Sequence, residues 1–435
     1  MDYLHEGETI KLMKMTLRIK RRSIPQWLVM FILIFPMVSA ALIQLGGLPR
    51  SLLYSMDFAW IVLLGNECYR AAKTKRTRIS GLVAWILLFF ICTVLVYLVK
   101  WQSPLYLLWG IRNNFRYYVV FFALITYMSA QNAEDYLKLL DGMFYLNFAV
   151  TLIQNYLFGY RGDELGGIFG VEAGCNGSAV LFLCIVITKS VVYYLEKKET
   201  VGQCLAKCAC ALYVAALSEL KFFYVIFIVI IVMALVSTAF SWRKLLLVIA
   251  AFVGVSLGTL MLAQLFDNGG NWFTLGRMLE VVTSDRGYTS SYDLNRFTAI
   301  PMINELWLLN AGQRMFGLGL GNCDVSSFAF LQTPFYVNNG DMHYTWISYA
   351  MMYLETGWIG LMFYWGFFVA VFMRTFKLQK HGDSILVSYC RIGRIMAAVC
   401  IAISIYNASL RMEAGYMVYT ILAMPFAVYN NRKDH

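Results

Sequence analysis

The chain has 435 residues, of which 60% are hydrophobic and only 14% are charged. Soluble domains carry about 25% charged residues, so this composition excludes a soluble globular protein and is typical of a polytopic membrane protein. The net charge of +11 would suit a nucleic-acid-binding protein, but the positions of the basic residues indicate a different role for the charge.

Apolar runs of about 18 or more residues recur along the chain, and each could cross about 30 Å of hydrocarbon as a helix. The first run is too long for a cleavable signal peptide. The runs predict twelve helices in chain order, at 27–46, 50–68, 80–99, 117–130, 137–157, 177–195, 203–219, 222–240, 244–266, 357–374, 386–404 and 412–429.

The predicted fold class is therefore all-α, a polytopic membrane protein with about 12 transmembrane helices and one long extracytoplasmic loop that contains short helices. The expected parts are a basic cytoplasmic leader (1–26), helices one to nine (27–266), the long extracytoplasmic loop (267–343), an interfacial helix followed by helices ten to twelve (344–430), and a cytoplasmic tail (431–435).

Lysine and arginine are concentrated in the leader and in alternate connections between the predicted helices. Since basic residues favour the cytoplasmic side, this pattern predicts that both termini are cytoplasmic. The charge is then mainly a signal of membrane topology, and nucleic acid is not an expected partner. Representative residues are Lys11, Arg21, Arg70, Lys75, Lys197, Arg243, Lys377 and Lys380.

The tenth helix is too long to cross the membrane upright. A single helix from 344 to 374 would span about 46 Å at roughly 1.5 Å per residue. We therefore expect a break at Glu355-Thr356-Gly357, where Thr356 would cap a new helix and Gly357 would relax the backbone. In the preceding loop, Pro301 begins a pattern of apolar residues that predicts a short amphipathic helix.

His343 is a candidate general base. The predicted topology places the three other histidines, at 5, 381 and 435, in cytoplasmic segments, whereas His343 faces outward. An imidazole can accept a proton from an attacking hydroxyl near neutral pH. The alternative is a histidine that only anchors a helix end at the membrane interface. Asp341 would either orient the imidazole or cap a helix.

Basic residues on the outer side form the second candidate group. Guanidinium groups bind phosphate oxygens through two parallel hydrogen bonds and keep their charge, so these side chains could surround a diphosphate. The alternative is pairing with lipid headgroups or with Asp285, Asp293 and Glu305. The candidates are Arg116, Lys221, Arg277, Arg286, Arg296 and Arg314.

The segment 316–322 reads Phe-Gly-Leu-Gly-Leu-Gly-Asn, with glycine at 317, 319 and 321. Exposed backbone N–H groups in such a loop, Gly319 included, could cradle an anion, although a plain turn explains the pattern equally well. No acidic pair with DxD spacing, no Walker A sequence and no G-x-S-x-G motif is present, so we expect neither a metal ion nor another cofactor. Asp57, Asp141 and Lys189 lie within or near predicted helices, and they either line a cavity or lie near helix ends.

Two of these motifs, together with the topology, resemble a known family. Arg296 precedes an apolar-aromatic stretch and the glycine-rich segment, and His343 precedes a helix with the pattern Glu355-x-Gly357-x-x-Gly360. With ten to twelve helices and one long outer loop late in the chain, the sequence resembles the O-antigen polymerase and O-antigen ligase superfamily of bacterial membrane glycosyltransferases. The similarity in motifs covers about residues 212–374.

The resemblance implies a GT-C-like architecture in the bacterial cytoplasmic membrane, with an extracytoplasmic active site. It implies undecaprenyl-diphosphate-linked oligosaccharides as substrates, and membrane lipids, a chain-length regulator and a flippase as partners. His343 and Arg296 match the catalytic positions of the family, and Glu355 lies in its second motif. Lys221 departs from the family pattern, which often has arginine after serine at this helix start.

The first functional hypothesis is a polymerase that joins lipid-linked repeat units into a surface polysaccharide such as O-antigen, capsule or exopolysaccharide. The near alternative is a ligase that passes a finished glycan to another acceptor. The alternative of another class is a flippase or exporter of lipid-linked oligosaccharides. A transporter should have paired broken helices in corresponding halves, whereas here the polar features concentrate in one outer loop.

Overall fold

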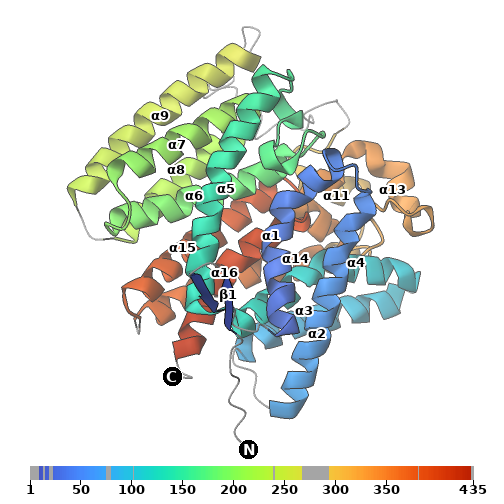
Figure 1. Cartoon of the computed structure of the whole chain (residues 1–435). Coiled ribbons are helices and arrows are strands. Elements are labelled where there is room, and N and C mark those ends of the chain that lie inside the picture. The colour runs from blue at the N-terminus through green and yellow to red at the C-terminus, as the bar shows by residue number, and fades with distance from the viewer. Residues whose placement is uncertain are drawn as a thin grey trace, which may run out of the picture.

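The computed structural model describes residues 9–12, 15–18, 23–74, 80–100, 102–238, 241–266, 293–380 and 382–432. The leader contains a short antiparallel hairpin, formed by β1 (Thr9–Leu12) and β2 (Met15–Arg18), which the sequence did not predict. All the long elements of the described chain are helices (Figure 1).

Twelve long helices in the described part of the chain each overlap one of the twelve predicted ranges. They are α1 (Ile24–Gln44), α2 (Ser55–Thr74), α3 (Ser80–Lys100), α4 (Pro104–Tyr127), α5 (Ala130–Tyr156), α6 (Asn176–Leu195), α7 (Val201–Leu217), α8 (Lys221–Val236), α9 (Trp242–Phe266), α14 (Ser348–Gln379), α15 (Ser384–Tyr406) and α16 (Gly415–Arg432). Seven of them, α1, α3, α5, α6, α9, α14 and α15, are long and apolar enough to cross a bilayer. The chain is therefore a multi-pass membrane protein. We predict that the other five long helices also cross the membrane.

The fourth helix differs most from its prediction. It was expected at 117–130, but α4 begins at Pro104, with Pro104 in its first turn. The polar residues Arg112, Asn113 and Arg116 hid the helical pattern, because their partners lie elsewhere in the chain. Arg112 forms an ion pair with Asp57 at 2.8 Å, for example. Arg112 and Arg116 therefore lie within a helix and not in the short outer connection expected from the sequence.

The connections between the helices gather at two ends of the molecule. The connections that precede α2, α4, α6, α8 and α16 contact one another or residues 293–347, and we call this the loop end. The hydrogen bonds that establish it are Val171 N to Gln44 Oε1 (3.1 Å), Gln102 Nε2 to Leu318 O (3.2 Å), Ser218 Oγ to Leu165 O (2.8 Å) and Arg411 Nη2 to Asp324 Oδ2 (2.7 Å).

The described parts of the connections after α6, α8 and α14 meet at the opposite end. There Arg391 forms an ion pair with Glu196 at 2.6 Å, Lys198 donates a hydrogen bond to the backbone oxygen of Ser384 at 3.1 Å, and Arg243 donates one to Tyr194 O at 2.8 Å. Lys198 and Arg243, which belong to the basic connections that predicted a cytoplasmic side, lie at this end. The two groups of connections thus agree with the alternation predicted from the charges, and the identity of the cytoplasmic side stays a prediction.

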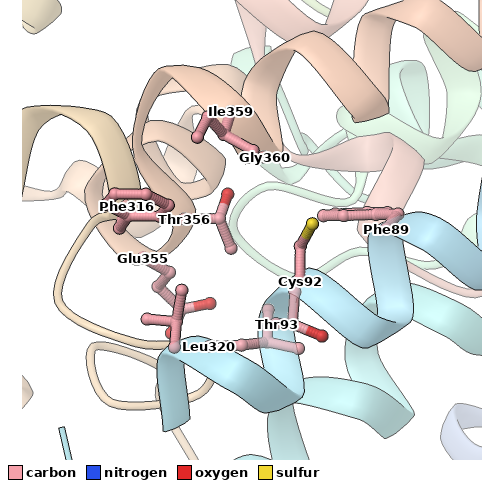
Figure 2. Close-up of a pocket in the computed structure, with 10 residues that line it drawn as sticks. Phe89, Cys92, Thr93, Phe316, Leu320, Glu355, Thr356, Ile359 and Gly360 are labelled. Atoms are coloured by element: carbon pink, nitrogen blue, oxygen red, sulfur yellow. The ribbon is translucent and has the colours of Figure 1, made fainter. Parts of the chain in front are cut away.

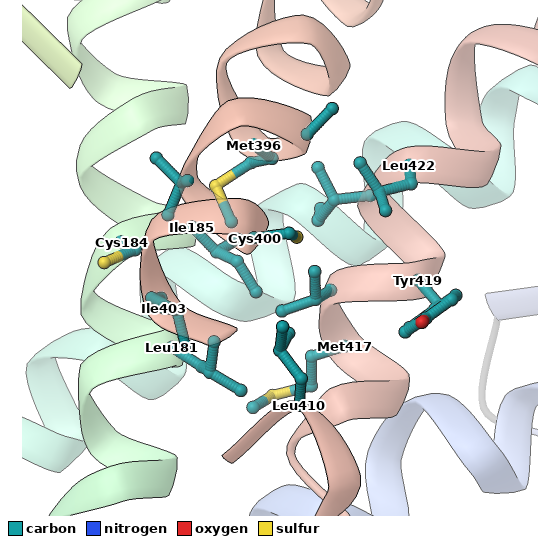
Figure 3. Close-up of a cluster of buried hydrophobic side chains, with 14 of the residues drawn as sticks. Leu181, Cys184, Ile185, Met396, Cys400, Ile403, Leu410, Met417, Tyr419 and Leu422 are labelled. Carbon is teal, nitrogen blue, oxygen red and sulfur yellow. The ribbon is translucent and has the colours of Figure 1, made fainter. Parts of the chain in front are cut away.

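The core lies around α6. In the apolar window of α6, 94% of the residues are buried, against 17% for α9 and 22% for α3 at the periphery. Leu181 and Ile185 of α6 point toward Met396 and Cys400 of α15 and toward residues of α16 (Figure 3). Since apolar side chains gain little by leaving lipid for protein, close packing of this kind holds a membrane bundle together.

Two of the charges expected to need explanation inside the helices, Asp141 and Lys189, are paired with each other. Asp141 of α5 and Lys189 of α6 form an ion pair, and Lys207 of α7 and Glu199 complete a four-residue cluster at the opposite end. Burial raises the pKa of Glu199, but hydrogen bonds from Lys189 and Ser190 outweigh it, so the pKa lies below its ordinary value. The cluster ties three helices together.

Candidate functional site

The segment from Asp293 to Ile347 covers the loop end with short helices. They are α11 (Ala299–Leu306), α12 (Ala311–Phe316), η4 (Ala329–Leu331), α13 (Pro334–Asn339), η5 (Gly340–Met342) and η6 (Tyr344–Trp346). Helix α11 is the amphipathic helix predicted at Pro301, and it begins two residues earlier. Proline is tolerated there because the first turn of a helix has no internal partner for its N–H groups.

His343 is held by a carboxylate and an aromatic ring. Its Nδ1 lies 2.8 Å from Oδ1 of Asp293, which is buried, while about a third of the His343 side chain is exposed. The imidazole stacks on Trp346 with ring centroids 3.8 Å apart. A carboxylate partner favours the tautomer with the proton on Nδ1, which leaves the Nε2 lone pair to accept a proton. This is the arrangement that a general base requires.

The carboxylate beside His343 is therefore Asp293, fifty residues away in sequence. Asp341, which the sequence offered for this role, is exposed in the first turn of η5. His343 itself has φ of 54°, in the left-handed region, between two short 3-10 helices. Backbone strain of this kind in a residue other than glycine is often found where a side chain must point in a fixed direction.

Arg296 lies on the same segment, three residues after Asp293. The backbone of Leu294 donates a hydrogen bond to Met342 O at 3.1 Å, which joins the two ends of the loop next to His343. The hydroxyl of Tyr349 donates to Arg296 O at 2.6 Å. The backbone segments that carry the candidates Arg296 and His343 are thus joined at the loop end.

The guanidinium group of Arg296 lies over the ring of Tyr406, 4.7 Å from its centroid, at the end of α15. Phe222 of α8 stacks on the same ring, with centroids 4.7 Å apart and an interplanar angle of 18°. Lys221 directly precedes Phe222 and begins α8, where it pairs with Glu219 at 2.9 Å. The stack of Arg296, Tyr406 and Phe222 therefore places the guanidinium group of Arg296 near the first turn of α8, the helix that Lys221 begins.

Arg116 is not available at this site. Its side chain is 2% exposed, and its Nη1 lies 3.7 Å from Asp57 and 3.5 Å from Glu413. Its Nη2 donates to the hydroxyl of Tyr117 at 2.7 Å. Because Asp57 and Glu413 already lie beside this buried guanidinium group, the structure gives Arg116 a structural role and does not support the prediction that it contacts a substrate diphosphate.

Arg314 has a local structural role. Its Nε donates to Leu308 O at 3.0 Å and its Nη2 to Asn304 O at 3.5 Å. These bonds link the end of α11 to α12. The side chain is exposed, and no substrate is needed to explain its position. Arg277 and Arg286 lie outside the described residues.

The glycine-rich segment packs against a break in α14. As the length of the helix predicted, the break is at Gly357, with φ of 63° and ψ of −164°. Leu318 N–H donates to Leu354 O at 2.9 Å, and Gly319 N–H donates to Glu355 O at 2.8 Å. The loop thus satisfies carbonyl groups that the break frees from the helix. The sequence had suggested that the N–H group of Gly319 could bind an anion. In the structure this group is already used in the hydrogen bond to Glu355 O.

Two further expectations about the break are corrected. Thr356 does not cap a new helix, because its Oγ1 donates backward to Met352 O at 2.6 Å. Glu355 is buried and accepts a hydrogen bond from Cys323 N at 3.1 Å. Figure 2 shows its side chain in a small pocket between α3 and α14, which Thr93 and Leu320 also line. In this position Glu355 holds residues 320–324 against α14, which is a structural role.

Arg411 anchors the same region from the connection between α15 and α16. Burial lowers its pKa, but the negative charges of Asp324 and Glu355 outweigh burial and hold the pKa above the ordinary value for arginine. Asp324 also accepts a hydrogen bond from Asn113 of α4 at 2.8 Å. These contacts join α4, the connection between α15 and α16, and residues 320–324 into one support for the loop.

The close approach at the break gives a testable prediction. A Cβ atom on Gly317 would lie 2.3 Å from the backbone of Glu355, and Gly317 has φ of 72°. We expect Gly317→Ala to lower the melting temperature in detergent by several degrees, whereas Gly312→Ala in α12, where a Cβ meets only an ordinary contact at 3.4 Å, should leave it unchanged. Equal melting temperatures for the two variants would contradict the packing described here.

Sequence reasoning missed Trp346 and Tyr406 and considered Asp293 only as a partner for arginine. Each acts through a contact between residues far apart in sequence, which no local pattern reveals. No family model matches this chain, and no curated protein matches it either.

Proposed function

We propose that this protein is a membrane glycosyltransferase that uses a sugar linked to a lipid diphosphate as donor. One observation carries the proposal: His343, oriented by Asp293, lies on the same segment as Arg296, whose guanidinium is stacked at Tyr406 close to the start of α8. A general base and a group of cations at one end of a membrane bundle suit this chemistry.

In the proposed reaction a hydroxyl of the acceptor attacks the anomeric carbon of the donor sugar. Nε2 of His343 takes the hydroxyl proton as the new C–O bond forms. The bond from the anomeric carbon to the diphosphate oxygen breaks, and the lipid diphosphate leaves with the bonding electrons. Arg296 and Lys221 stabilise the negative charge that develops on the diphosphate, so no metal ion is required in the proposal.

Within this class we propose a polymerase acting on undecaprenyl-diphosphate-linked repeat units at the outer face of a bacterial cytoplasmic membrane. A ligase that transfers a finished glycan would use the same residues. The twelve-helix GT-C-like topology, with both termini in the cytoplasm, is part of the proposal, and so are a chain-length regulator and a flippase as partners. These finer assignments rest on the resemblance and on the charge distribution.

The break in α14 favours an enzyme over a flippase. Broken helices in transporters leave backbone groups open to a substrate pathway near the middle of the membrane. In this protein Leu318 and Gly319 already occupy the carbonyl groups of Leu354 and Glu355. The break is therefore filled by the loop, and it fixes the position of the segment that carries Arg296 and His343.

The glycans of a deletion strain that carries the variants distinguish the three functions. We expect His343→Ala to abolish long surface chains while single lipid-linked repeats persist, which is the result for a polymerase. Long chains that stay on the lipid carrier would indicate a ligase. Single repeats confined to the inner leaflet would indicate a flippase, and wild-type glycans would contradict the proposal. The matched control is Asp341→Ala, at an exposed residue of η5.

A further inference from the structure

Residues 325–337, which we call the apolar strap, are uncharged, and most of their side chains are at least partly exposed, Ser326, Leu331 and Thr333 being buried. No acidic or basic residue occurs from Val325 to Gly340, although the strap belongs to a solvent-accessible loop. Large apolar side chains nonetheless point outward: Phe330 and Val337 are each 67% exposed, and Val325 and Phe328 more than a third. Such a concentration of exposed apolar side chains is typical of a surface that contacts a membrane or another protein.

The strap is fixed to membrane helices at the loop end. Trp109 Nε1 of α4 donates to Val325 O at 3.0 Å, and the hydroxyls of Tyr54 and Ser327 lie 3.0 Å apart. The ring of Phe328 packs against Tyr54 at 5.4 Å and against Trp109 at 6.1 Å. Tyr54 ends the short helix η1 (Arg50–Tyr54), which leads into α2. The strap therefore has a defined position beside the first turns of α2 and α4.

The surface of α4 next to the strap is also apolar. Leu105 and Leu108, one turn or less from Trp109, are 47% and 61% exposed. The candidate spanning helix α3 ends at Lys100, four residues before α4 begins, so these leucines lie close to the level where a span ends. Tryptophan, tyrosine and phenylalanine are typical of this boundary between hydrocarbon and lipid headgroups.

We propose that the apolar strap docks into the lipid leaflet at the loop end, with Phe330 and Val337 in the boundary between acyl chains and headgroups. The occupant is bilayer lipid, because the strap is continuous with the outward-facing leucines of α4 and carries no charge to pair with a protein or glycan partner. Docking would hold residues 293–347 at a fixed depth relative to the membrane surface. This inference does not depend on the glycosyltransferase proposal.

Spin labels on the full-length protein in lipid nanodiscs test the docking. The parent carries Cys68→Ser, because Cys68 is the exposed cysteine among the described residues. A nitroxide is attached in Phe330→Cys, and Val337→Cys is a second strap position. The matched control, Asp341→Cys, lies at an exposed polar residue four positions beyond the strap. Power saturation then compares collisions with oxygen, which enriches in lipid, and with a water-soluble nickel chelate.

We expect the labels at 330 and 337 to collide mainly with oxygen and the label at 341 mainly with the nickel chelate. Nickel accessibility at 330 and 337 equal to that at 341 would overturn the inference. Spectral broadening at 330 that disappears on dilution with unlabelled protein would also overturn it, because the strap would then contact a second copy of the chain. Glycan synthesis in the same variants tests the proposed function separately.

Discussion

His343→Ala is expected to lower glycosyl transfer from a lipid diphosphate donor by about 10²- to 10⁴-fold, the usual contribution of a positioned general base. The protein should keep its fold, because the imidazole is partly exposed and its main partners are Asp293 and Trp346. Transfer is measured with purified protein in proteoliposomes, by the appearance of elongated lipid-linked glycan. Activity within a factor of two of wild type would exclude His343 as the base.

Asp293→Asn tests whether the carboxylate positions the imidazole. The amide has nearly the same shape as the carboxylate but lacks its charge, so it no longer favours the tautomer with the proton on Nδ1. We expect a partial loss of transfer, smaller than for His343→Ala, with an unchanged melting temperature. In the double variant the Asp293 substitution should add no further loss, because the two residues act as one unit. Additive losses would mean that Asp293 acts independently of His343.

Arg296→Ala is the second prediction with a large expected effect. Removing one group that stabilises developing negative charge typically costs about 10²- to 10³-fold in rate. Arg296→Lys should recover only part of the loss, because an ammonium group cannot form the paired hydrogen bonds of a guanidinium group. The readout is the release of the lipid diphosphate by the variants. Full activity of Arg296→Ala would remove the main cation from the proposed mechanism.

Tyr406 supplies a control that separates the position of Arg296 from its charge. Tyr406→Phe keeps the ring that carries Arg296 and Phe222 and should therefore keep transfer activity. Tyr406→Leu removes the ring and should lower transfer although Arg296 is still present. Equal activity of the phenylalanine and leucine variants would show that the stack does not position the guanidinium group.

The sequence predicted the helices well where the chain is uniformly apolar and poorly where buried polar residues pair at long range. The break at Gly357 was predictable because an unbroken helix would exceed the thickness of a bilayer. The start of α4 was not predictable, because charged residues such as Arg112 and Arg116 are typical of a connection outside the membrane. Only the folded structure shows that they pair with Asp57 and Glu413.

The sequence singled out the two central residues of the candidate site but not the side chains that orient them. Local motifs pointed to His343 and Arg296. Asp293 contacts His343, and Tyr406 contacts Arg296, only because folding brings together residues that are far apart in sequence. The glycine-rich segment could be recognised in the sequence, but its role could not, because alternating glycines suit both an anion cradle and close backbone packing. Only the hydrogen bond from Gly319 to Glu355 O decides for packing.

The most direct test of the account is transfer by the Arg296→Ala, His343→Ala double variant in proteoliposomes that contain a defined undecaprenyl-diphosphate-linked oligosaccharide. Wild-type protein should lengthen the lipid-linked glycan and release undecaprenyl diphosphate in equal amount. The double variant, folded and inserted to the same extent, should do neither above background. Elongation by the double variant at the wild-type rate would contradict the central claim that the base and the cation at the loop end carry out glycosyl transfer.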